Sequence, residues 1–100
     1  MTAASTFELL GTWTSDPEDE EGRLEFGQTT IEFDEDGKLT YTVHEPGTDQ
    51  KMFLIFRVEG QTLITNQPSS PREERTIYAI GQDGKLTLWF GGKRAVYVRS

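Results

Sequence analysis

The chain has no cysteine and only one histidine among its 100 residues. Without thiols there is no disulfide framework, no thiolate nucleophile and no cysteine-based zinc site, and His44 has no second histidine with which to share a metal ion. Long hydrophobic runs are also missing. The first eleven residues lack the basic and apolar regions of a secretion signal, and no later segment approaches the length of a membrane span. We therefore expect a cytoplasmic protein with no metal and no other cofactor.

Positive charge is scarce, because 10 lysines and arginines stand against 17 acidic residues, giving a net charge of -7. Such a charge repels nucleic acid and anionic membranes, so we expect neither as a partner, whereas a basic protein surface stays open as one. Part of the negative charge is concentrated in one segment, whose spacing does not fit a calcium-binding EF-hand loop. We expect a solvated loop there, with a functional acidic lip as the alternative; its carboxylates are Asp16, Glu18, Asp19, Glu20 and Glu21.

The remaining sequence has the pattern of one all-β domain covering residues 1–100. Ser5 and Glu8 form a capping-box pattern that predicts a short N-terminal helical turn. After it, alternating apolar and polar residues predict eight strands. Their expected ranges are 11–15, 29–34, 38–44, 51–59, 62–66, 75–80, 85–90 and 94–99.

The connections between these strands predict how the sheet is arranged. Asp36-Gly37, Glu59-Gly60 and Asp83-Gly84 are typical of tight hairpin turns, in which glycine supplies a positive φ. In an up-and-down meander these three turns close the same end, and three of the four connections at the other end are longer. A meander of eight antiparallel strands leaves two exposed edges unless the sheet closes. The sequence therefore predicts an eight-stranded antiparallel up-and-down meander that closes into a small barrel.

The inward-facing residues of such a barrel either fill it or form the wall of a pocket, and the sequence leaves both alternatives open. In the hollow case, the candidates for contacts with a ligand in the lumen are Tyr41, Met52, Phe56, Leu88 and Tyr97. The expected inward set also contains Ile31, Phe33, Leu39, Val43, Leu54, Leu63, Ile77, Leu86 and Phe90. No Asp or Glu interrupts the expected apolar faces, so we expect no buried general acid, no catalytic residue and no enzymatic activity.

The segment 51–59 breaks the alternation, because Phe53 and Ile55 are apolar on the face opposite the predicted core. Trp89 and Tyr78 are also expected to point outward. Exposed large apolar side chains often mark a protein contact, so Phe53, Ile55 and Trp89 are candidates for a homodimer or partner interface. The alternative is that the barrel flattens and the N-terminal turn packs over them.

Gly11-Thr12-Trp13 at the start of the first strand resembles the Gly-x-Trp signature of the calycins, the superfamily of lipocalins, fatty-acid-binding proteins and avidins. The resemblance implies a barrel whose closed end is plugged by Trp13, with Arg99 of the last strand packed across the indole. The chain departs from the best-known members. It is shorter than a typical lipocalin, has no two-helix lid, and carries Tyr97-Val98-Arg99 in the reverse order of the carboxylate-binding Arg-x-Tyr. No particular ligand therefore follows from the resemblance.

Two functional hypotheses follow from these observations. The first is a small non-catalytic binding protein that takes up an apolar or amphipathic small molecule at the open end of a lipocalin-like barrel. The second is a protein-interaction domain with a filled barrel, such as an acidic inhibitor or immunity-type protein, which uses the outer aromatic patch or the acidic loops. The two hypotheses differ in whether the aromatic side chains point into a lumen or toward a partner.

Overall fold

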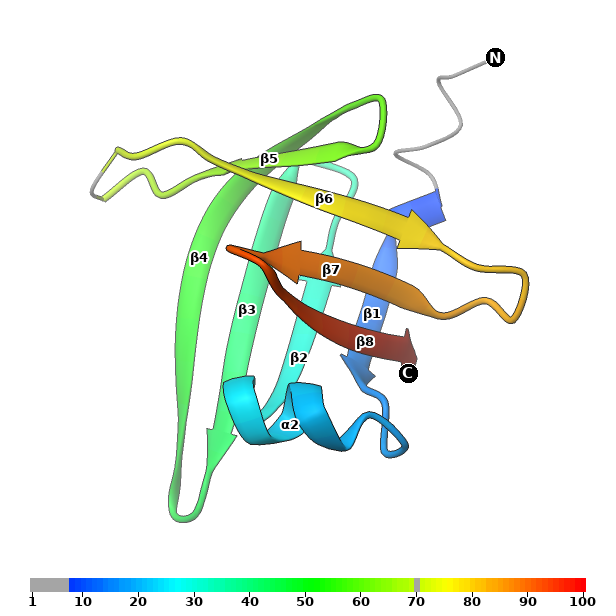
Figure 1. The fold of residues 1–100 in the computed structure, drawn as a ribbon. Helices are drawn as coiled ribbons and strands as arrows, with labels where there is room; N and C mark the ends of the chain where they lie inside the picture. The colour runs from blue at the N-terminus through cyan, green and yellow to red at the C-terminus, as the bar shows by residue number, and fades with distance from the viewer. Residues whose placement is uncertain (1–7, 70) are drawn as a thin grey trace.

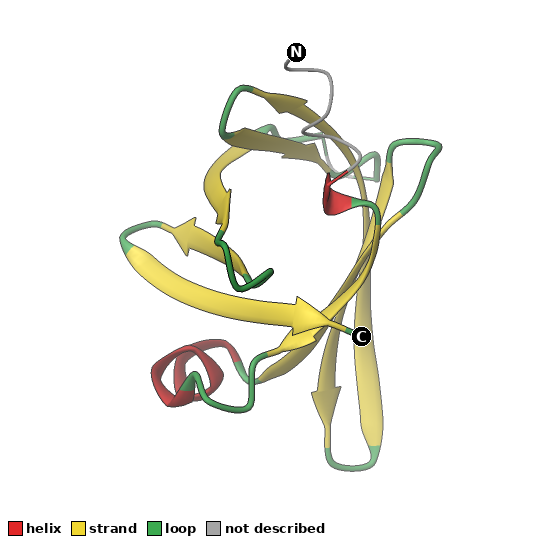
Figure 2. Cartoon of the chain, turned by 90° about the vertical axis from the view of Figure 1, so that its right-hand side faces the viewer, coloured by secondary structure: helices red, strands yellow, loops and turns green. Residues whose placement is uncertain are grey.

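The structure, a computed structural model, describes residues 8–69 and 71–100. Each strand pairs antiparallel with the next, and β1 also pairs with β8, so the sheet closes (Figures 1 and 2). The predicted all-β meander barrel is thereby confirmed. Its strands are β1 (Gly11–Ser15), β2 (Gln28–Phe33), β3 (Lys38–Glu45), β4 (Thr48–Glu59), β5 (Thr62–Asn66), β6 (Glu74–Ile80), β7 (Leu86–Phe90) and β8 (Lys93–Arg99).

The glycine turns close one end of the barrel. Gly37, Gly60 and Gly84 have φ values of 79°, 62° and 80°, which favour glycine because they lie in the left-handed region. The β3–β4 connection at the other end is shorter than we expected. Gly47 also has a positive φ, and the strands pair right up to the turn, with Glu45 opposite Thr48. Residues 45–50, expected to form a loop, therefore belong mostly to a long hairpin that projects from the barrel (Figure 1).

The expected loop between β1 and β2 contains a helix, α2 (Glu20–Phe26). Asp19 caps it, because its carboxylate accepts a hydrogen bond of 3.1 Å from the Gly22 N–H. The other Asp19 oxygen accepts a bond of 2.8 Å from the Val96 N–H and so ties the helix to β8. Glu20 and Glu21 in the first turn complement the helix dipole. Within the described residues, no helix has the length and apolar character needed to span a membrane.

Asp16, at the start of the same connection, is buried rather than solvated. Its carboxylate lies 2.8 Å from the Lys85 ammonium and accepts a hydrogen bond of 3.0 Å from the Glu18 N–H. The Lys85 side chain and then the Glu18 N–H hold the pKa of Asp16 below its usual value. Asp16 and Asp19 of the acidic run are thus structural residues, which corrects the expectation of a solvated loop.

The register of β6 differs from the predicted one. Residues directly opposite each other in an antiparallel ladder lie on the same face of the sheet, and Tyr78 is opposite Leu88 of the core. Tyr78 is therefore inside and only 6% exposed, whereas Ile77, opposite Trp89, is outside and 50% exposed. Both residues were predicted on the opposite face, and that prediction is wrong. The cause is the segment 75–80, whose apolar side chains fall on both faces, so that the alternation does not define the register.

The closed end is built around Trp13, which is fully buried. The Arg99 guanidinium carbon lies 4.2 Å from the centre of the indole ring, and its two terminal nitrogens donate hydrogen bonds to the carbonyls of Leu10 (2.7 Å) and Glu8 (2.5 Å). Gly11 has a φ of 115°, and a Cβ there would lie 3.0 Å from an Arg99 nitrogen. Ser5 of the expected helical turn lies outside the described residues, although Glu8 and Leu9 are helical.

Candidate binding cavity

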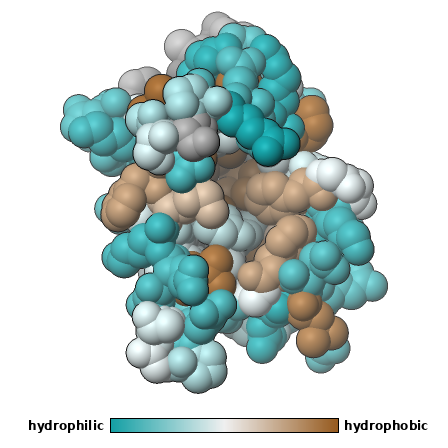
Figure 3. Space-filling model, turned by 90° about the vertical axis from the view of Figure 1, so that its left-hand side faces the viewer, coloured by the Kyte–Doolittle hydropathy of each residue, from teal (hydrophilic) through white to brown (hydrophobic). Residues whose placement is uncertain are grey.

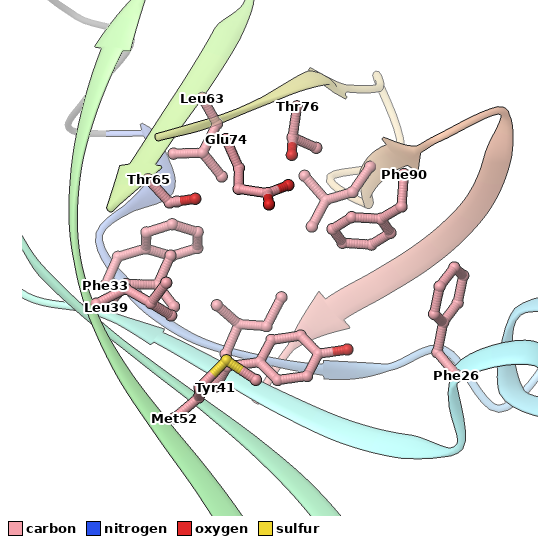
Figure 4. A pocket seen from close by; sticks show the side chains of 13 residues that line it. Phe26, Phe33, Leu39, Tyr41, Met52, Leu63, Thr65, Glu74, Thr76 and Phe90 are labelled. Carbon is pink, nitrogen blue, oxygen red and sulfur yellow. The ribbon is translucent and has the colours of Figure 1, made fainter. Parts of the chain in front are cut away.

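The barrel is hollow between its two ends and contains a cavity of about 360 Å³ (Figure 4). Its wall is formed by side chains from the six strands β2 to β7 and from α2, and most of these side chains are apolar or aromatic. The buried part of the wall is formed by Ile31, Phe33, Leu39, Leu63, Thr76 and Leu88. The other lining residues are Phe26, Tyr41, Met52, Leu54, Thr65, Glu74 and Phe90.

Aromatic side chains define the shape of this cavity. Phe26, the last residue of α2, packs edge-on against Phe90 of β7 with ring centroids 5.1 Å apart. Phe33 packs in the same way against Phe56, at 5.0 Å. Edge-to-face pairs of this kind fix both rings and so hold the wall in place without filling the lumen. Met52 is 44% exposed and therefore lies at the opening.

The polar groups of the wall are three hydroxyls and one carboxylate. Tyr41, Thr65 and Thr76 supply the hydroxyls, and among the described residues Glu74, at the start of β6, is the only charged one that lines the cavity. Figure 4 shows the Glu74 carboxylate directed into the space between Thr65, Thr76 and Phe90. The same carboxylate lies 3.2 Å from Nε of Arg72, a highly exposed side chain. Glu74 corrects the expectation that no acidic residue lies on an inward face.

Of the predicted lumen residues, Tyr41, Met52 and Leu88 line the cavity. Phe56 and Tyr97 instead pack with the core beside it. The Tyr97 hydroxyl is 3.2 Å from Oγ1 of Thr29, which donates to it, and Thr29 is itself fully buried. Burial, and secondly the neighbouring Tyr41, raise the pKa of Tyr97 above its ordinary value, so the phenol stays neutral.

Two signals in the sequence could have identified the missed lining residues. Glu74, Thr76 and Tyr78 alternate along β6, and choosing this register would have placed both Glu74 and Thr76 inside. For Phe26, the signal is Asp19 followed by Glu20 and Glu21, a combination typical of a helix start. Thr65 carried no signal, because a threonine fits either face of a strand.

The outer candidates lie in two separate places. Phe53, which is 64% exposed, and Ile55 are on β4, whereas Trp89 is three strands away on β7, beside Ile77. Another outward apolar residue, Ile64 of β5, is by contrast buried between arginines of the two neighbouring strands. These arginines, Arg57 and Arg75, form ion pairs with Glu59 and Glu73.

Half of β4 has an exposed edge. β4 pairs with β3 over Thr48 to Ile55, but it pairs with β5 only from Ile55 to Glu59. On the side away from β3, residues 48–54 have no neighbouring strand within the described part of the chain; we call this segment the free edge of β4. It includes Met52 and Leu54, which line the cavity. Figure 3 views the side of the molecule on which β4 lies and shows apolar groups gathered across its middle, around a hollow.

His44 lies outside the cavity, near the tip of the β3–β4 hairpin. Its ring nitrogens lie 2.7 Å from the Thr30 hydroxyl and 3.3 Å from the Asp49 carboxylate. Over residues 8–69 and 71–100, no three His, Asp or Glu side chains are grouped as ligands of a metal ion.

The chain was also compared with known proteins. No protein-family model, no curated protein and no solved structure matches it.

Proposed function

We propose that the protein is a small, non-catalytic, calycin-like binding protein that takes up an apolar or amphipathic small molecule in the barrel cavity. The observation that carries the proposal is the cavity of about 360 Å³, lined mainly by apolar and aromatic side chains and a few polar groups. Small-molecule sites typically have such a lining and volumes of about 300 to 1,000 Å³. The ligand is accordingly a small one.

The calycin-like assignment rests on two further features. The eight strands form a closed meander in sequence order. In addition, Trp13, Arg99 and Gly11 are brought together at the closed end, where the guanidinium covers the indole. These are the residues on which the resemblance to the superfamily depends.

The test is a titration with N-phenyl-1-naphthylamine, a neutral apolar dye whose fluorescence rises in an apolar site. Met52→Trp should block the opening and weaken dye binding at least tenfold, because the Met52 side chain lies at the mouth of the cavity. Phe53→Trp is the matched control: the neighbouring residue on β4 points outward and should leave binding unchanged. If wild type does not bind the dye, or if both variants bind as wild type does, the proposal fails.

A second candidate function, a protein-interaction domain, is favoured by the free edge of β4 and the exposed Phe53. An exposed edge strand is a template for pairing with another strand. We propose a second copy of this chain as the partner, because the edge is complementary to itself. Antiparallel pairing of two β4 edges about Gln50 would place Asp49 of each copy opposite Lys51 of the other. Opposite charges in this position stabilise a strand pair.

A charge exchange tests this second candidate by analytical ultracentrifugation. Lys51→Glu should place two carboxylates opposite each other and shift a dimer toward monomer, and Asp49→Lys should do the same with two ammonium groups. The double variant should restore the dimer, since it exchanges the charges and keeps the complementarity. A monomeric wild type, or a double variant as dissociated as either single one, would refute this mode of assembly.

A further inference from the structure

The electrostatic character of the cavity comes from Glu74, the one charged side chain on its wall within residues 8–69 and 71–100. Among the described lining residues there is no lysine, arginine or histidine, and the nearby Arg72 is already paired with Glu74, so a carboxylate ligand would face the Glu74 charge without a cation on the wall. We propose that the ligand carries a protonated amine, whose ammonium group pairs with the Glu74 carboxylate while its apolar body occupies the aromatic part of the cavity. This inference rests on the proposed function and specifies the chemical class of its ligand.

The groups around Glu74 suit an ammonium group better than a neutral head group. An ammonium has three donors and no acceptor. Around the carboxylate, the Thr65 and Thr76 hydroxyls lie on the same stretch of wall and can accept the remaining N–H groups (Figure 4). Phe90 presents an aromatic ring at the same place, and rings attract cations that approach their faces. The hydroxyl oxygens, the carboxylate and the ring therefore all favour a cation.

Arg72 already pairs with Glu74, at 3.2 Å, and would compete with the ligand. This ion pair is weak, because both side chains are exposed, Arg72 to 82% and Glu74 to 57%, and exposed pairs contribute little. A ligand whose ammonium group reaches Glu74 from the lumen also buries its apolar body in the cavity. The Arg72 guanidinium brings no such apolar group into the cavity. The net charge of -7 also raises the concentration of cations near the protein and lowers that of anions.

Three probes of nearly equal shape separate the charge of the head group from the apolar body: phenethylamine, 2-phenylethanol and phenylacetate. We expect wild type to bind phenethylamine about tenfold more tightly than 2-phenylethanol, and phenylacetate most weakly, as measured by chemical-shift titrations of the 15N-labelled protein. The shifts should be largest for the backbone of the cavity residues.

Variants of Glu74 and Arg72 test whether the preference for the amine depends on the Glu74 carboxylate. Glu74→Gln should abolish the advantage of the amine and leave the affinity for the alcohol within twofold, and Glu74→Lys should make phenylacetate the tightest of the three. Glu35→Gln removes the same charge from the exposed β2–β3 turn and should change nothing, so it controls for net charge. Arg72→Ala should strengthen phenethylamine binding, because the competing cation is gone.

The outcomes distinguish this inference from the proposed function. If the amine and the alcohol bind equally, or if Glu74→Gln and Glu35→Gln weaken the amine equally, the inference is overturned while the cavity remains a binding site. If none of the three probes binds and N-phenyl-1-naphthylamine does not bind either, the proposed function itself has failed.

Discussion

Replacing Arg99 by alanine tests the account of the closed end, because this one side chain connects three parts of the chain. Its guanidinium covers the buried indole of Trp13 at 4.2 Å and donates to the carbonyls of Leu10 and Glu8. Among the described residues, no other side-chain hydrogen bond joins the segment before β1 to β8. Arg99→Ala should therefore both destabilise the barrel and expose Trp13.

The magnitude follows from the three interactions that are lost. A cation over an aromatic ring contributes about 0.5 to 1 kcal/mol at an exposed site. Each hydrogen bond contributes about 0.5 to 1.5 kcal/mol, and the lower end applies here because Arg99 is partly in water. The sum is about 2 kcal/mol in the free energy of unfolding. For a domain of this size, that corresponds to a fall in Tm of about 8 °C or more.

The assay is urea unfolding followed by tryptophan fluorescence, with thermal unfolding as a second readout. Arg94→Ala is the matched control, because Arg94 lies on the same strand and is exposed, so its loss should cost at most about 0.5 kcal/mol. Arg99→Ala should also shift the emission of the native protein to longer wavelength as water reaches Trp13. If the two variants are equally stable and have the emission of wild type, the closure attributed to Arg99 is refuted.

Two further predictions concern the connection between β1 and β2. The lowered pKa of Asp16 means that its ionised form stabilises the folded state: the contribution is present above the pKa of the unfolded chain, near 3.8, and is lost as the pH falls through the lower folded value. Asp16→Asn should therefore cost about 1.5 kcal/mol at pH 7 and almost nothing at pH 2 in urea unfolding; an equal cost at both pH values would contradict the role given to its charge. Asp19→Ala removes the cap of α2 and the bond to the Val96 N–H, so it should cost about 2 kcal/mol and reduce hydrogen-exchange protection of the α2 amides. Glu20→Ala, one residue later, should leave that protection intact, and equal loss in both variants would argue against a specific cap.

The fold could be predicted because its signals are local. Each strand of the meander pairs with the next one. Gly37, Gly60 and Gly84 mark the turns between neighbouring strands, because the turns require the positive φ that glycine adopts most easily. Such features need no knowledge of distant contacts. The sequence therefore indicated the number of strands, their order and the closure of the barrel.

The candidate site was harder to predict, because it depends on register and on contacts between distant residues. Glu74 faces the cavity only because β6 is aligned by Leu88 opposite Tyr78, and the segment's own pattern favoured Ile77 instead. The helix that supplies Phe26 is short and rich in carboxylates. It is held by the bond from Val96 to Asp19, across 77 residues of chain.

Native mass spectrometry of the protein freshly purified from the cells that make it is the most direct test of the central claim, that the cavity holds a small molecule. We expect one additional small mass per chain, which is released on collisional activation, retained by Phe53→Trp and absent from Met52→Trp. A wild-type chain that carries no added mass under gentle conditions, or a mass retained equally by both variants, would contradict it.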